Sequence, residues 1–306
     1  MNQRYQIPPA TAVSMAANVR AYLELMRLKN VFLAAITVPL GAQFAIGDSW
    51  IDKYLIEVLL QVMAVIFFIG AGNTMNDIKD CEIDKTAHPN RPLPSKQVSI
   101  VNAKIFTWVL WIASFSCMGY GAYRLSESGM SWIPLVVIYI AAVLLMLSYD
   151  HGPKTKNSGL IGNVSISLMV GAVILYGSSS VSAIESNLVW WTAGVVFFTN
   201  LAREIVKDCQ DMESDEGIRN TLPMTFGLQN SRMLAYVIIM AALVCLYMPY
   251  WKGSFEFGQL FFQTPAILLL ITLNGPLYNG DDVLVASRIR IAMLLGLIGF
   301  IITMYV

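Results

Sequence analysis

Residues 54–84 read YLIEVLLQVMAVIFFIGAGNTMNDIKDCEID, an apolar run that passes directly into an acidic segment. The apolar part, residues 54–75, has the length of about 20 residues that a helix needs to cross a bilayer. The acidic part, residues 76–84, carries three aspartates spaced as DxxDxxxD. The stretch therefore predicts a membrane-spanning helix with a cluster of carboxylates at one end.

The rest of the chain repeats this apolar pattern. Hydrophobic residues make up 56% of the 306 positions and charged residues only 13%, which is about half the charged share of a soluble domain. We expect an all-α polytopic membrane bundle of about nine transmembrane helices in a single domain, residues 1–306. The first 20 residues lack the pattern of a signal peptide and are interpreted as an interfacial lead-in. The expected spans are 26–47, 54–75, 100–124, 131–149, 160–178, 187–206, 231–250, 257–274 and 287–306.

The basic residues are distributed unevenly between the predicted loops, although the formal net charge is zero and by itself says nothing about partners. No nucleic-acid partner is expected. If the N-terminus and the loops after spans two, four, six and eight share one side, only Lys53, Arg124 and Lys252 of the 20 basic residues lie opposite. The positive-inside rule then places the N-terminus and both acidic segments in the cytoplasm. We expect a multi-pass protein of the cell membrane with the C-terminal Val306 outside.

A second acidic segment, residues 208–215, repeats the DxxDxxxD spacing after the sixth span. On a helix, offsets of 0, 3 and 7 point the same way, so each segment would form one stripe of carboxylates. Carboxylates held together need a cation, and hard oxygen ligands suit Mg²⁺, which usually also binds phosphate oxygens. A diphosphate could then bridge two Mg²⁺ ions between the segments. The alternative is that each segment is a solvated helix end. The candidate ligands are Asn76, Asp77, Asp80, Asp84, Asp208, Asp211 and Asp215.

Basic residues lie beside both acidic segments, where they could stabilise a departing diphosphate. Arg91 and Lys207 are the preferred candidates because each is next to a cluster, although such residues also serve as topology markers. The loop of residues 88–95 is too rich in proline to continue a helix and predicts an extended turn. No disulfide framework is expected from the four cysteines. The further basic candidates are Lys85, Arg203, Lys154 and Lys156.

With these residues in hand, the chain resembles the UbiA family of intramembrane prenyltransferases. Residues 76–84 match its first signature, NDxxDxxxD, and are followed by the familial loop of residues 90–95; residues 208–215 match the second signature, followed by Thr221-Leu222-Pro223. The resemblance implies a helical bundle with a central lipid-accessible cavity, in which two Mg²⁺ ions hold a prenyl diphosphate at the cytoplasmic end. Ionisation of the allylic diphosphate would leave a carbocation that a lipophilic acceptor attacks.

The resemblance also implies roles for individual residues. The catalytic carboxylates would be Asp80, Asp84, Asp211 and Asp215. Metal and diphosphate ligation would fall to these four together with Asn76 and Asp208, and Asp77 is either a further ligand or a residue that shapes the loop. The expected substrate-binding residues include Arg91, Lys207, Tyr149 and either Lys154 or Lys156 in the loop that follows Tyr149. Arg27 and Asn30, at the entry to the first span, are also expected to bind substrate, with interface anchoring as the alternative.

Local resemblances favour different acceptors. Residues 25–30 and 203–208 are similar to geranylgeranylglyceryl phosphate geranylgeranyltransferases, so geranylgeranylglyceryl phosphate is the preferred acceptor. Residues 149–163 are similar to chlorophyll-synthase-like members, so an aromatic quinone or tetrapyrrole precursor stays open. An alternative of another class is a polytopic transporter of cations or organic phosphate. Such sites tend to lie near the bilayer midplane, whereas both acidic segments lie at span ends.

Overall fold

The computed structural model describes residues 19–150, 155–215, 217 and 220–306, and this part of the chain contains helices and no β-strand. It forms two compact units, which are described separately. Unit 1 comprises residues up to Ile36 together with Leu60–Tyr120, and unit 2 comprises Thr37–Leu59 together with Gly121–Val306. Of the predicted N-terminal lead-in, residues 1–18 lie outside the described part.

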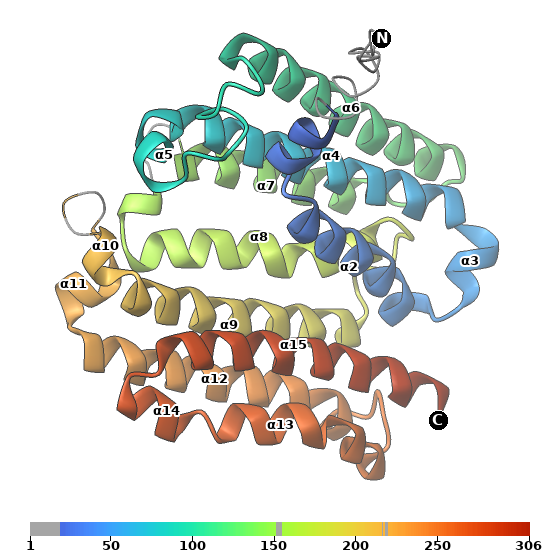
Figure 1. Ribbon diagram of the computed structural model, residues 1–306. Coiled ribbons are helices and arrows are strands. Elements are labelled where there is room, and N and C mark those ends of the chain that lie inside the picture. Colours follow the sequence, from blue (N-terminus) through green and yellow to red (C-terminus); the bar gives the residue numbers. More distant parts are fainter. Residues whose placement is uncertain (1–18, 151–154, 216, 218–219) are drawn as a thin grey trace, which may run out of the picture. The chain divides into compact units, whose positions relative to one another are not determined.

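The helices coincide with the apolar runs of the sequence (Figure 1). Each of the nine expected spans falls on one long helix, except residues 257–274, which are divided among η2, α13 and α14. The elements are α2 (Leu28–Ile46), α3 (Ser49–Lys53), α4 (Leu55–Lys79), α5 (Cys81–Ala87), α6 (Ile100–Glu127), α7 (Ile133–Asp150), η1 (Thr155–Asn157), α8 (Leu160–Ser179), α9 (Asn187–Gln210), α10 (Met212–Asp215), α11 (Leu222–Phe226), α12 (Leu228–Trp251), η2 (Phe257–Gln263), α13 (Thr264–Ile271), α14 (Asn274–Asn279) and α15 (Asp282–Tyr305).

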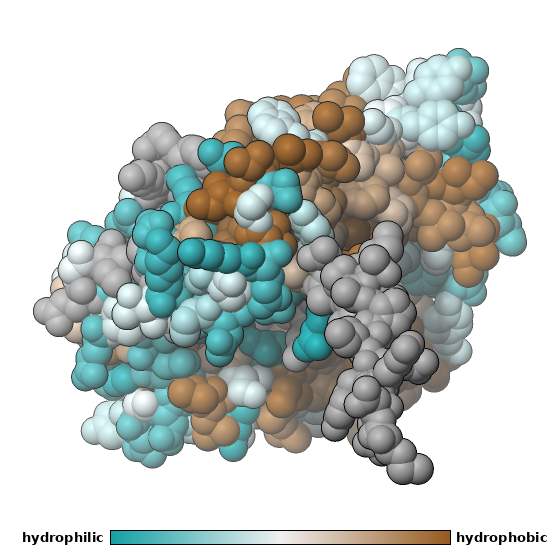
Figure 2. Space-filling view, turned by 45° about the horizontal axis from the view of Figure 1, so that its top comes forward, coloured by the Kyte–Doolittle hydropathy of each residue, from teal (hydrophilic) through white to brown (hydrophobic). Residues whose placement is uncertain are grey.

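Six helical segments are long and apolar enough to cross a membrane, so the chain has the composition of a multi-pass membrane protein. The apolar parts of α2 and α7 are shorter, and α9 carries charges toward its C-terminal end. Large apolar side chains are exposed on the surface, and Trp108 and Phe261 are 69% and 73% exposed. Figure 2 shows hydrophobic patches on the face it presents. Exposed apolar area on this scale fits contact with lipid. The six segments are Leu55–Lys79, Ile100–Glu127, Leu160–Ser179, Leu228–Trp251, Phe257–Asn279 and Asp282–Tyr305.

Unit 1 is organised around two small apolar clusters that hold the first acidic segment in place. Cys81, directly after the middle aspartate, packs with Leu25 and with Leu93 and Val98 of the proline-rich loop. A second cluster joins Met26 to Ala71 and Leu110. The loop that follows α5 is therefore held in place by buried leucine and valine side chains.

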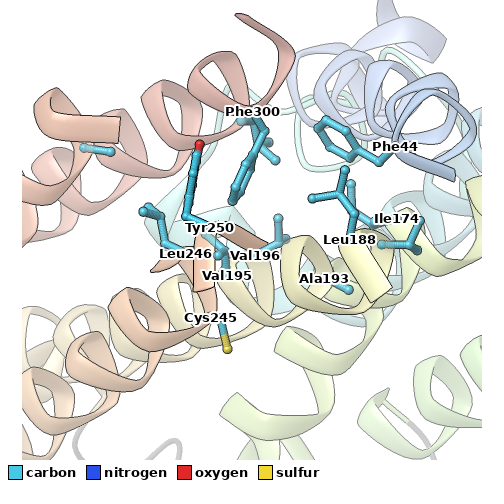
Figure 3. Packing of buried hydrophobic residues seen from close by; sticks show 13 residues of the cluster. Phe44, Ile174, Leu188, Ala193, Val195, Val196, Cys245, Leu246, Tyr250 and Phe300 are labelled. Carbon is cyan, nitrogen blue, oxygen red and sulfur yellow. The ribbon is translucent and has the colours of Figure 1, made fainter. Parts of the chain in front are cut away.

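Unit 2 has a larger core, built where α9 packs against α8, α12 and α15. In Figure 3, Phe300 of α15 and Tyr250 of α12 lie over Val196 of α9, and Phe44 joins them from α2. A second cluster continues along α9, α12 and α15 toward the end that carries the second acidic segment. This packing makes α9 the central helix of the unit.

Glycines let two helices of unit 2 touch through their backbones. A Cβ atom at Gly177 of α8 would lie 2.0 Å from the carbonyl oxygen of Val38, and one at Gly41 would lie 2.2 Å from the carbonyl oxygen of Ile174. No side chain fits at either position, since real Cβ atoms do not approach so closely. Small residues at such positions let helices of a membrane bundle approach closely.

Candidate active site

The first acidic segment lies at a break between two helices. α4 ends at Lys79 and α5 begins at Cys81, so Asp80 stands at the junction with φ −86° and ψ 5°. Backbone hydrogen bonds continue on both sides, because the Asp80 amide donates to the Asn76 carbonyl at 2.9 Å and the Asp84 amide to the Asp80 carbonyl at 2.8 Å. The expected single helical stripe is therefore bent at its middle aspartate, a residue type whose side chain competes with helical hydrogen bonding.

The second acidic segment has the same local construction. α9 ends at Gln210 and α10 begins at Met212, and Asp211 stands between them with φ −94° and ψ 4°. The Asp211 amide donates to the Lys207 carbonyl at 2.8 Å, and the Asp215 amide to the Asp211 carbonyl at 2.9 Å. The two segments thus share their local backbone geometry as well as the repeated DxxDxxxD spacing.

Two arginines pair with the carboxylates of the first segment. Asp77 and Asp84 are only 5% and 4% exposed. The Arg27 Nη2 atom lies 2.5 Å from Asp77 Oδ1, and the Arg91 Nη1 atom lies 2.7 Å from Asp84 Oδ2 and 3.9 Å from Asp77 Oδ1. Buried carboxylates need such partners, because an unpaired buried charge is strongly destabilising. Arg91, predicted to contact diphosphate, is thereby brought against the acidic segment.

Arg27 reaches Asp77 from an unusual backbone position. It has φ +55°, in the left-handed region that non-glycine residues seldom adopt, and it lies in the turn that precedes α2. The side-chain amide of Asn73 donates to the Met26 carbonyl at 2.8 Å and so holds this turn against α4. The structure places the Arg27 guanidinium on Asp77, whereas its expected role at the acceptor stays a prediction.

A shallow pocket of about 260 Å³ adjoins Arg91 in unit 1. It is lined by Glu24, His88, Pro89, Asn90 and Arg91, so the proline-rich loop forms most of its wall. Nearby on α5, Lys85 donates to Glu82 with Nζ 2.7 Å from Oε2, and this hydrogen bond raises the pKa of Lys85. Lys85 therefore pairs with a carboxylate of its own helix in this structure, and its predicted contact with diphosphate stays a prediction.

The second segment is held by an amide from α8. The Asn163 Nδ2 atom donates to Asp208 Oδ2 at 2.8 Å, and Asn163 is only 8% exposed. One turn further along the α8–α9 contact, Asn200 donates to Ser167 Oγ at 3.0 Å. The sequence gave Asn163 no role in the site; its only signal was a polar side chain on an apolar helix.

Basic side chains accompany the second segment as well. On α9 the two oxygens of Glu204 take different partners: Arg203 Nη1 lies 2.6 Å from Oε1 and Lys207 Nζ lies 3.4 Å from Oε2. A further pair, Arg232 and Asp282, joins α12 to the start of α15 through two hydrogen bonds of 2.9 and 2.7 Å. The sequence did not reveal this bidentate pair, because 50 residues separate its partners.

The predicted ligands have suitable chemistry, but a complete metal site stays a prediction. Within the described residues, no three acidic, histidine or cysteine side chains gather closely enough to hold a metal ion. The donor types nevertheless fit Mg²⁺, which needs only one or two carboxylates when phosphate oxygens complete its shell. All four cysteines are free, as expected.

The middle-loop candidates are only partly described. Tyr149 lies in the last turn of α7 and Lys156 in η1, and Asn30 lies in α2. Lys154 lies outside the described residues, and the side chains of Lys156 and Asn30 are likewise outside the description. The choice between the two lysines therefore stays open.

Comparison with known proteins decides the family. The model of the UbiA prenyltransferase family matches residues 31–282, which include both acidic segments. The chain belongs to the UbiA prenyltransferase family. This UbiA protein is 30% identical over 295 residues to the digeranylgeranylglyceryl phosphate synthase of Methanococcus aeolicus, covering 94% of the chain and 99% of the relative. It is 32% identical over 287 residues to the synthase of the same name from Methanopyrus kandleri, covering 92% and 98%.

Solved structures agree with this assignment. A structure of digeranylgeranylglyceryl phosphate synthase in membranes superposes with a TM-score of 0.77 at 27% identity, covering 94% of this chain and 98% of the other. A UbiA homologue from Archaeoglobus fulgidus, bound to DMAPP and Mg²⁺, gives a TM-score of 0.63 at 14% identity over 93% and 99% of the two chains. The second likeness concerns the fold alone.

Proposed function

We propose that this UbiA prenyltransferase transfers a geranylgeranyl chain from geranylgeranyl diphosphate to geranylgeranylglyceryl phosphate. The observation that carries the choice of acceptor is the similarity, over nearly the whole chain, to proteins named digeranylgeranylglyceryl phosphate synthase. That name describes a glyceryl phosphate with two geranylgeranyl chains, so the acceptor carries one chain and one free hydroxyl. These relatives favour neither the aromatic acceptors nor the transporter.

The site would be assembled from both acidic segments, with two Mg²⁺ ions held by Asn76, Asp80 and Asp84 on one side and by Asp208, Asp211 and Asp215 on the other. Bound Mg²⁺ would neutralise the diphosphate and make it a better leaving group. The A. fulgidus homologue, bound to DMAPP and Mg²⁺, supports this choice of metal. Asp77, which pairs with Arg27, is either a further ligand or a residue that shapes the loop.

The chain's own residues support the reaction in two ways. Arg91 and Lys207, each beside an acidic segment, supply positive charge to the departing diphosphate as its bond to the allylic carbon breaks and it takes the electron pair. The acceptor hydroxyl oxygen then bonds to that carbon, and its proton leaves to solvent or a nearby base. Apolar helices shelter the allylic cation from water.

The membrane arrangement belongs to the same proposal. The bundle would have nine spans, with α2, α7 and α9 added to the six candidates, and a central cavity open to lipid for the prenyl chain. The distribution of basic residues among the loops, by the positive-inside rule, supports a cytoplasmic N-terminus and cytoplasmic acidic segments, with the C-terminus outside. A single domain would comprise all 306 residues.

A panel of acceptors tests the proposed function. Purified protein in detergent receives Mg²⁺ and geranylgeranyl diphosphate with geranylgeranylglyceryl phosphate, 4-hydroxybenzoate or a naphthoate, and diphosphate release is measured. We expect release with the glyceryl phosphate and none above background with the aromatic acids. Release with an aromatic acid alone would contradict the proposed acceptor.

A further inference from the structure

A group of cations lies on α9 before the second acidic segment. Arg203 and Glu204 are largely buried, with side chains 18% and 15% exposed, and their ion pair measures 2.6 Å between Nη1 and Oε1. The two carboxylate oxygens of Glu204 pair with different cations, one with Arg203 and the other with Lys207, so two cations share one anion. These two cations and one anion leave a net positive charge that can attract another anion.

One atom of this group lacks a partner. The Nε atom of Arg203 is buried and has no hydrogen-bond acceptor among the described residues. A buried donor without an acceptor costs free energy, so native structures rarely leave one unsatisfied. An unpaired guanidinium N–H points to a ligand with oxygen acceptors.

A second arginine approaches from another helix. Arg290 of α15 is close enough for its positive charge to act on Arg203. Arg290 is exposed, and within the described part of the chain no carboxylate pairs with it. An anion bound between the two guanidinium groups would offset the repulsion between their charges.

The two arginines also lie at similar depths. Asp282, at the start of α15, acts electrostatically on Cys209 in the second acidic segment, so the two helix ends are close. At 1.5 Å per residue, Arg290 lies about 12 Å along α15 from Asp282, and Arg203 about 8 Å along α9 from Asp208. Arg203 therefore lies between one and two helical turns from Asp208, a proposed ligand, and Arg290 lies about two turns from the start of α15.

We propose that Arg203 and Arg290 form a binding subsite for the phosphate monoester of the lipid acceptor. The inference rests on the proposed function. In a glyceryl phosphate with one prenyl chain on a terminal carbon, the phosphate and the free hydroxyl are on adjacent carbons, so the phosphate must bind a short way from the reacting diphosphate. Guanidinium groups recognise phosphate through paired hydrogen bonds, and Arg203 Nε is available for such a bond.

Two changes test the subsite: the positive charge of each arginine is removed by substitution, and the phosphate is removed from the acceptor. The full chain in detergent, with Mg²⁺ and geranylgeranyl diphosphate, is assayed for diphosphate release with geranylgeranylglyceryl phosphate and with geranylgeranylglycerol. We expect Arg290→Gln and Arg203→Gln to raise the KM for the phosphorylated acceptor roughly 10- to 100-fold, the value of a charged hydrogen bond. The KM for the donor should change by less than about twofold.

The dephosphorylated acceptor provides the decisive comparison. Wild type and both variants should use geranylgeranylglycerol equally well, since the arginines then have no phosphate to bind. Arg288→Gln is the matched control, because Arg288 is two residues from Arg290 on α15 and points about 200° away around the helix. It should leave both KM values unchanged. Arg290 is exposed, so its variant should fold even if the Arg203 variant does not.

Three results would overturn the proposal. A rise in donor KM with no change for the acceptor would show that the arginines serve the diphosphate. Equal losses with both acceptors would show a structural role only. If the wild type releases diphosphate with neither acceptor but is active with an aromatic one, the proposed function fails and the subsite fails with it.

Discussion

Replacing Asn163 should weaken the metal site without unfolding the protein. Asn163 donates a 2.8 Å hydrogen bond to Asp208, a proposed Mg²⁺ ligand. A hydrogen bond to a charged group contributes about 1.5–3 kcal/mol, and loss of a residue that orients a metal ligand typically costs 10- to 100-fold in metal affinity. We therefore expect Asn163→Ala to raise the Mg²⁺ concentration for half-maximal activity by roughly 10- to 100-fold.

The assay is diphosphate release at saturating donor and acceptor over a Mg²⁺ titration. Turnover of Asn163→Ala at saturating Mg²⁺ should recover most of the wild-type value, because only the orientation of a ligand is lost. Asn163→Asp should be worse than the alanine variant, since it sets two carboxylates against each other. Ser165→Ala is the control: Ser165 is also buried on α8 but donates within its own helix, to the Ile161 carbonyl. An unchanged Mg²⁺ requirement in Asn163→Ala would refute the reasoning.

Three further predictions concern other parts of the chain. Asp80→Ala and Asp211→Ala should each abolish turnover while the protein remains folded in detergent, and appreciable activity in either would contradict the two-segment site. Gly177→Ala should lower the midpoint of thermal unfolding, because its Cβ would lie 2.0 Å from a backbone oxygen. Gly119→Ala is the control and should leave the midpoint unchanged, because a Cβ there meets nothing within 4 Å. Equal midpoints for the two variants would contradict the close approach. Arg27→Ala should reduce the free energy of unfolding by about 1–3 kcal/mol by leaving its carboxylate partner less well paired, and an unchanged denaturation midpoint would show that the pair is unimportant.

The helices were predictable because their apolar runs have the length of membrane spans. Residues 54–75 predicted the span that became α4, and the proline-rich loop predicted the end of α5. The breaks at Asp80 and Asp211 were not foreseen, since a spacing of 0, 3 and 7 is equally compatible with an unbroken helix. The structure adds that both segments break at the same position of the motif.

The partners of the carboxylates could not be predicted from one sequence. Arg27 and Asp77 are 50 residues apart, and Asn163 and Asp208 are 45 apart, so each contact depends on tertiary packing. Proximity along the chain did predict that Arg91 would accompany the first segment, seven residues after Asp84. The combined site of both segments stays a prediction, because its members belong to two separately described units.

The most direct test of the account is the mass of the product that the purified protein forms from geranylgeranyl diphosphate and geranylgeranylglyceryl phosphate. The account predicts a glyceryl phosphate with two geranylgeranyl chains, whose formation stops when EDTA removes Mg²⁺ and resumes when Mg²⁺ is restored. Absence of this product, or its undiminished formation in EDTA, would contradict the account.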